Sequence, residues 1–149
     1  MHLNPDFKEF IELLNKNQIK YLLVGGYAVA YYGYPRYTKD IDIWIECSQG
    51  NAQKIVSVLE VFGFKSNDLN ITDFTEKENI IQFGYPPCRI DILTSIDGVD
   101  FENCFINRKI DTIDDIDVNI ISLKDLALNK KSTGRYQDLA DLEKIETSE

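Results

Sequence analysis

Two carboxylates, Asp40 and Asp42, open an apolar run and are the residues of this sequence best suited to chemistry. Side chains two residues apart on a strand point to the same face. Two charges about 4 Å apart repel by roughly 4 kcal/mol at an effective dielectric of about 20, so a cation between them is favoured. Asp91 adds a third acid between Ile90 and Ile92, where an unpaired carboxylate is costly to bury.

These acids predict a divalent-metal site. Mg²⁺ takes oxygen ligands and keeps several waters. Two such ions about 3.5–4 Å apart clamp the attacking and leaving oxygens of a phosphoryl transfer. We therefore expect Asp40, Asp42 and Asp91 to hold one or two Mg²⁺ ions, with Asp91 as a ligand or as the acceptor of a proton from the attacking hydroxyl. The alternative is that the acids cap a turn or face solvent.

A glycine pair, Gly25-Gly26, follows the apolar run Leu22–Val24 and precedes a short helical pattern. Glycine lets backbone N–H groups approach a phosphate with no Cβ in the way, and helix N-termini attract anions. The pair lacks the Gly-Lys-Ser/Thr of a Walker loop and does not match Gly-x-Gly-x-x-Gly. We expect a phosphate cradle that faces the metal site, although glycine pairs also occur in ordinary turns.

Polar residues of two segments could bind the phosphates of a nucleotide. Arg36 and Thr38 precede the acids, and Lys130 and Arg135 cluster in an otherwise acidic C-terminal third. The alternatives are a solvated loop cation for Arg36 and helix-end cations for Lys130 and Arg135, since cations suit C-terminal turns.

Two acids of the last helical pattern, Asp138 and Asp141, follow this basic cluster. Their spacing predicts surface pairs, or i,i+3 pairs, with Arg135 and Lys144.

The remaining sequence predicts one domain, residues 1–149, built as an α/β or α+β fold with helices packed on a mixed sheet. Asn4 is expected to cap the first helix, Gly63 to end the third, and Ser122 to start a helix through about Lys131. The segment 65–77 is expected to be irregular. Strands are expected at 20–25, 40–47, 80–85, 89–94, 109–113 and 118–121, and helices at 27–32, 52–62, 101–106 and 135–145.

Composition limits the function classes. With 44% hydrophobic residues, 149 residues can form one core without disulfides. The three scattered cysteines, Cys47, Cys88 and Cys104, are expected to be free or buried thiols. The only histidine is His2, which argues against histidine-based catalysis. A net charge of −9 argues against a large nucleic-acid footprint.

The expected location is the cytoplasm. No apolar run approaches the roughly 20 residues that cross a bilayer. The first residues lack the basic start and apolar region of a secretion signal.

The combination of Gly25-Gly26, Asp40-x-Asp42 and Asp91 resembles the DNA polymerase beta-like nucleotidyltransferase superfamily. Two segments resemble its small bacterial branch, which includes abortive-infection toxin-type and lincosamide-resistance nucleotidyltransferases. These are the Arg-x-Thr-x-Asp-x-Asp of residues 36–42 and the Lys-Lys-Ser-Thr-Gly-Arg-Tyr-Gln-Asp-Leu-Ala-Asp-Leu of residues 130–142. The resemblance covers roughly residues 20 to 145.

The resemblance implies a short mixed sheet flanked by helices, NTP such as ATP as donor, Mg²⁺ as cofactor and pyrophosphate as leaving group. It implies that Gly25 and Gly26 hold the triphosphate. Asp40 and Asp42 would bind metal, and Asp91 would be the third carboxylate. Lys130 would contact phosphate, supported by Arg135 and Asp138. A toxin–antitoxin setting is implied by the resemblance alone.

The main hypothesis is a Mg²⁺-dependent enzyme that moves a nucleoside monophosphate from NTP to a hydroxyl of a protein, a tRNA or a small molecule. A chain of 149 residues leaves little room for an acceptor domain, so specificity would come from loops, a homo-oligomer or a partner protein. The net charge favours a protein or small-molecule acceptor over tRNA. The alternatives are a non-catalytic nucleotide-binding module of the same fold and a metal-dependent phosphodiesterase.

Overall fold

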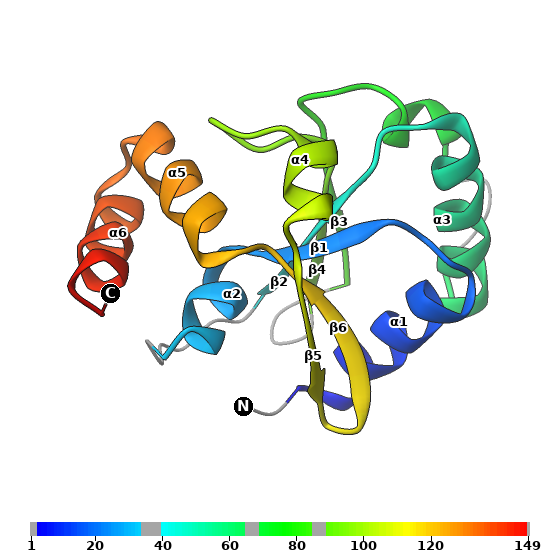
Figure 1. Cartoon of the computed structure of the whole chain (residues 1–149). Helices are drawn as coiled ribbons and strands as arrows, with labels where there is room; N and C mark the ends of the chain where they lie inside the picture. Colours follow the sequence, from blue (N-terminus) through cyan, green and yellow to red (C-terminus); the bar gives the residue numbers. More distant parts are fainter. Residues whose placement is uncertain (1–2, 34–39, 65–68, 85–88, 149) are drawn as a thin grey trace.

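A mixed six-stranded sheet organises the chain, with strand order β3-β4-β2-β1-β6-β5 (Figure 1). The computed structural model describes residues 3–33, 40–64, 69–84 and 89–148. The strands are β1 (Tyr21–Val24), β2 (Asp40–Ile45), β3 (Ile80–Phe83), β4 (Arg89–Leu93), β5 (Lys109–Ile113) and β6 (Ile116–Ile120). The expected mixed α/β architecture is confirmed.

Helices pack on both sides of the strands. They are α1 (Pro5–Lys16), α2 (Gly25–Tyr31), α3 (Gln49–Phe62), α4 (Phe101–Ile106), α5 (Leu123–Thr133) and α6 (Tyr136–Ser148), with a 3₁₀ turn, η2 (Ile71–Phe74). In Figure 1, α1 and α3 lie to the right of the strands, and α2, α5 and α6 lie to the left. None of the described helices is both long and apolar enough to cross a membrane.

The pairing of β2 with its two neighbours places the acids. β2 runs antiparallel to β1 and parallel to β4. Its register sets Asp40 beside Arg89 and Asp42 beside Asp91, while Val24 at the end of β1 lies across from Asp42. The parallel pair requires a long crossover, and α3 forms part of it.

Helix ends follow the expected caps. The Asn4 side chain accepts a hydrogen bond from the Asp6 backbone N at 2.8 Å, and Ser122 accepts one from Asp125 at 3.1 Å. Gly63 ends α3 with φ +116, a left-handed conformation that glycine adopts at low cost. These local signals predicted the starts of α1 and α5 and the end of α3.

Several expected element bounds differ from the structure by one to three residues, and two differences affect the site and the core. A strand was expected through Gly25 and a helix from Tyr27, but β1 ends at Val24 and α2 begins at Gly25. The reason is that Gly25, at φ +67, turns the chain directly from strand into helix. Within the segment expected to be irregular, η2 buries Phe74 to 1% exposure, so this part of the chain contributes to the core.

One buried amide ties the start of β1, the end of β2 and the start of α3 together. Asn51 is 5% exposed. Its Oδ1 accepts from the Lys20 backbone N at 2.9 Å, and its Nδ2 donates to the carbonyls of Lys20 and Glu46, each at 3.0 Å. The start of β1 and the end of β2 are therefore both hydrogen-bonded to α3 through this one side chain.

Asn51→Ala should lower the free energy of unfolding by about 2–3 kcal/mol, because three hydrogen bonds are lost and only the Lys20 carbonyl keeps another one, from the Glu46 backbone N at 3.2 Å. Urea denaturation measures the change. Gln53→Ala, at an exposed position of the same helix, is the matched control and should change stability by less than about 0.5 kcal/mol. Equal losses in both variants would contradict the role given to Asn51.

Candidate active site

Three acids expected from the sequence lie on adjacent strands. Asp40 and Asp42 are on β2, and Asp91 is on β4, beside Asp42 in the parallel register. Asp91 is buried, at 7% exposure, while Asp40 and Asp42 are half-buried. The period-two spacing thus brings the three carboxylates to one place, as predicted.

An arginine that the sequence analysis did not single out lies between two of these acids. Arg89 donates from Nε to Asp91 Oδ1 at 2.9 Å and from Nη2 to Asp91 Oδ2 at 3.0 Å. The same Nη2 donates to Asp40 Oδ2 at 2.5 Å. The signal was present, because Arg-x-Asp on a strand puts both side chains on one face.

The charged form of the third acid, Asp42, is disfavoured by its surroundings. Burial raises the pKa of Asp42 to about 7, and repulsion from Asp91 and then Asp40 adds to the rise, while Lys130 opposes it. A carboxyl group in such surroundings is stabilised by a cation.

The donor set fits a divalent ion in its chemistry, since carboxylate oxygens are the ligands that Mg²⁺ prefers. However, over the described ranges, no three His, Cys, Asp or Glu side chains are arranged as a ready metal-ligand group. Arg89 donates hydrogen bonds to both Asp40 and Asp91. The Mg²⁺ site therefore stays a prediction.

Gly25 packs directly on the Asp42 carboxylate. A Cβ at Gly25 would lie 2.1 Å from Asp42 Oδ2 and 2.9 Å from its Cγ. With φ +67, this position is also unfavourable for any side chain. Among the described residues, no side chain caps the start of α2 at Val24. Gly25 therefore serves the close approach of α2 to Asp42.

A cavity of about 690 Å³ opens beside Asp42. Two glycines, Gly25 and Gly26, and two cations, Lys130 and Arg135, line it together with Asp42. The other lining residues come from β1, from β3 and the turn before it, from the end of β4 and its following loop, and from α5 and α6: Val24, Glu78, Ile80, Leu93, Ser95, Ile96, Asp97, Asn129, Thr133, Gln137 and Asp138. Five of the predicted site residues therefore share one cavity. Arg36 and Thr38 lie outside the described residues.

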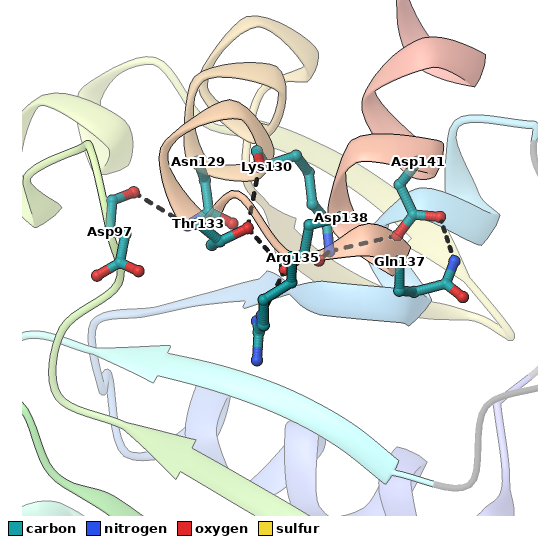
Figure 2. A network of polar contacts seen from close by, with 8 residues as sticks. All are labelled: Asp97, Asn129, Lys130, Thr133, Arg135, Gln137, Asp138 and Asp141. Carbon is teal, nitrogen blue, oxygen red and sulfur yellow. Dashed lines mark hydrogen bonds and ion pairs between the residues drawn. The ribbon is translucent and has the colours of Figure 1, made fainter.

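A polar network joins α5 to α6 over this cavity (Figure 2). Asp138 accepts hydrogen bonds from Lys130 Nζ, Thr133 Oγ1 and Arg135 Nε, each at 2.7 Å. Lys130 also pairs with Asp141 at 3.5 Å. Burial alone would raise the pKa of Asp138, but the bonds from Lys130 and Thr133 outweigh it and hold that pKa below its usual range.

The expectation that Asp138 and Asp141 are surface acids is wrong. They are 4% and 0% exposed, because Lys130 reaches them from the neighbouring helix. The expected i,i+3 pair of Arg135 with Asp138 is confirmed.

The two basic residues of the cavity differ in exposure. The Lys130 side chain is 5% exposed and bonded to two acids, so it is no solvated helix-end cation. The Arg135 side chain is 77% exposed, and in Figure 2 it extends from the α5–α6 turn away from both helices. Arg135 is thus the more accessible positive charge, and Lys130 reaches the cavity from a fixed position. Their contacts with phosphate stay predictions.

The fold is that of known nucleotidyltransferases. The lincosamide antibiotic adenylyltransferase LnuA, in a lincomycin-bound crystal structure, superposes with a TM-score of 0.59 at 18% identity, over 97% of each chain. A candidate nucleotidyltransferase from Thermotoga maritima superposes with a TM-score of 0.57 at 18% identity, over 98% of this chain and 92% of that one. At this identity, the likeness shows the fold alone.

The family is shown by the sequence itself. The sequence model of a family described as nucleotidyltransferase of unknown function (DUF6036) matches residues 2–148, and the chain belongs to this family. No curated protein sequence gives a match. The protein is therefore a nucleotidyltransferase, and the expected resemblance to nucleotidyltransferases is confirmed. Family and fold support the transfer of a nucleoside monophosphate in general.

Gly25→Ala should destabilise the protein by about 1–3 kcal/mol more than Gly134→Ala, because only the first adds a clash to the backbone strain. The two glycines have nearly the same φ, +67 and +68, but a Cβ at Gly134 meets nothing within 4 Å. Chemical denaturation of both variants measures the difference. Equal losses would mean that Asp42 does not need the space beside Gly25.

Asp42→Asn should change the free energy of unfolding more favourably at pH 8 than at pH 4.5. The difference between the two pH values should be about 2–4 kcal/mol. In the folded state, Asp42 has a pKa of about 7, against about 3.9 in the unfolded chain. The folded state therefore holds a proton that the unfolded state releases, and wild-type stability falls as pH rises from about 4 to 7. Asparagine removes this loss.

Urea denaturation at both pH values, in EDTA to exclude divalent ions, measures this effect. Gln53→Ala should follow the wild-type pH dependence. A gain from Asp42→Asn that is the same at both pH values would show that the carboxyl does not titrate in this window.

Proposed function

We propose that this protein catalyses the Mg²⁺-dependent transfer of a nucleoside monophosphate from an NTP to a hydroxyl group, with release of pyrophosphate. The observation that carries the proposal is one arrangement. Three acids are aligned by the register of β2 and β4, and one of them, Asp42, lines a cavity of about 690 Å³ together with two glycines and two cations.

Binding of the NTP in the cavity is supported by four lining residues, Gly25, Gly26, Lys130 and Arg135. The glycines line the cavity, so backbone N–H groups of the first turn of α2 would be the contacts for phosphate oxygens. Arg135 would contact the phosphates with its exposed guanidinium. Lys130 is held by Asp138 and Asp141, so it would contact a phosphate from a fixed position. Arg36 and Thr38 are proposed as further phosphate contacts on the sequence pattern alone.

Asp40, Asp42 and Asp91 would hold Mg²⁺, which when bound would neutralise charge on the triphosphate. The acceptor oxygen forms a bond to the α-phosphorus while the bond to pyrophosphate breaks. The hydroxyl proton passes to a carboxylate of the site and from there to solvent. Fixed cations near the leaving phosphates stabilise the negative charge that develops there.

The acceptor is proposed to be a small molecule or a protein side chain. Lining residues apart from the glycines and cations include the acids Glu78 and Asp97 and the apolar Ile80 and Ile96. The carboxylates among them disfavour the phosphates of an RNA acceptor. LnuA, an adenylyltransferase for lincosamide antibiotics, matches over 97% of its chain, so a protein of this fold needs no added domain to act on a small molecule.

The test incubates purified protein, Mg²⁺ and each α-³²P-labelled NTP with cell lysate, either intact or depleted of RNA. Label should pass to a non-nucleic acceptor in both lysates, with pyrophosphate released in equal amount. Asp42→Asn should lower the rate about 100-fold or more, as expected when a group that stabilises transition-state charge is removed. Gln53→Ala, remote in sequence and exposed, should keep the rate.

Three results would overturn parts of the proposal. Label lost on RNA depletion would replace the acceptor class with RNA. NTP binding without transfer would favour the non-catalytic module. Cleavage of phosphodiesters without pyrophosphate release would favour the phosphodiesterase.

A further inference from the structure

Arg89 makes more hydrogen bonds to the acids than a single surface ion pair would. It makes two parallel hydrogen bonds to Asp91 and a third to Asp40, from the strand that carries Asp91 to the strand that carries Asp40. Two parallel bonds between guanidinium and carboxylate fix both distance and orientation. Arg89 therefore sets the relative positions of two proposed metal ligands.

The same contacts oppose a divalent ion. Both oxygens of Asp91 and one of Asp40 accept hydrogen bonds from Arg89, and these oxygens would have to turn to an ion. The guanidinium keeps its positive charge at any physiological pH, so it cannot lose a proton to make room. A divalent ion shared by Asp40 and Asp91 would lie close to this positive charge, so its binding is favoured when the guanidinium moves away and gives up part of these bonds.

Arg89 has room to do so. It is the first residue of β4, and its side chain is 29% exposed, against 10% for Asp91. An arginine side chain has several rotatable bonds, so the guanidinium can move to solvent while the backbone of β4 stays paired.

We propose that Arg89 is a positioning residue that takes the place of the divalent ion. It holds Asp40 and Asp91 in register while no ion is bound, and it releases them when an ion enters. The affinity for divalent ions is then set by competition with Arg89. This inference rests on the proposed function, because it requires that the three acids bind a metal ion.

Mn²⁺ alone, without nucleotide, is the probe. The signal of free Mn²⁺ in electron paramagnetic resonance gives the dissociation constant for wild type, Arg89→Met, Arg89→Lys and Asp42→Asn. Arg89→Met should bind Mn²⁺ about tenfold or more tightly than wild type, because a charge-assisted hydrogen bond no longer has to be broken. Arg89→Lys keeps the charge but loses the paired geometry, so its affinity should lie between the two.

Arg108→Met is the matched control. Arg108 donates to the Phe105 carbonyl and to Asn119, and neither residue belongs to the acid cluster, so its loss should leave Mn²⁺ affinity unchanged. Circular dichroism establishes that each variant is folded. If Arg89→Met does not fold, the comparison of Arg89→Lys with wild type decides.

The outcomes separate this inference from the proposed function. If Asp42→Asn abolishes Mn²⁺ binding while Arg89→Lys and Arg89→Met match wild type, the metal site stands and the role of Arg89 is refuted. If Arg89→Lys binds Mn²⁺ with the wild-type affinity and only Arg89→Met binds it more tightly, Arg89 acts through its charge alone. That result also refutes the proposal that the ion displaces the guanidinium. No Mn²⁺ binding by any variant would overturn both.

Discussion

Repulsion among three carboxylates in an apolar sheet is the constraint on which this structure depends. The strands that carry the acids are otherwise nearly all hydrophobic, with Ile41, Ile43, Ile90 and Ile92 at 0–1% exposure. Burying like charges in such surroundings is unfavourable unless cations or hydrogen bonds compensate. Arg89 supplies compensation to Asp40 and Asp91. Gly25 lets α2 approach Asp42 where any other residue would collide with it.

A second charge cluster, on α5 and α6, is balanced within itself. Lys130 and Arg135 face Asp138 and Asp141, two cations against two acids. Removing one partner of such a buried set leaves an uncompensated charge, so the cluster fixes how α6 packs on α5. It also brings the exposed Arg135 to the cavity beside Asp42. The helices that close the cavity are thus held by the same kind of interaction that organises the acids.

Local sequence signals predicted most of the fold and part of the site. The helix caps at Asn4 and Ser122 and the helix end at Gly63 depend on contacts with residues only a few positions away in the chain. They can therefore be recognised from the sequence. The period of two placed Asp40 and Asp42 on one face. Burial of Asp138 and Asp141 could not be predicted, because their surroundings depend on Lys130 from another helix. The core contact of Phe74 likewise depends on packing and not on local pattern.

The distribution of charge at the acids indicates where an incoming cation would be most effective. With all three carboxylates ionised, the acids and Arg89 carry a formal charge of −2, which equals the charge of one divalent ion in magnitude. Arg89 binds Asp40 and Asp91, and the raised pKa falls on Asp42. Asp42 is also the acid that lines the cavity beside Gly25, Lys130 and Arg135. The acid whose charged form is disfavoured by burial is therefore also the one that lines the cavity where a cation would lie next to a nucleotide. The charge of Asp42 lowers the stability of the folded protein, because no neighbouring cation fully offsets it. The same uncompensated charge would attract the metal ion that the proposed catalysis requires.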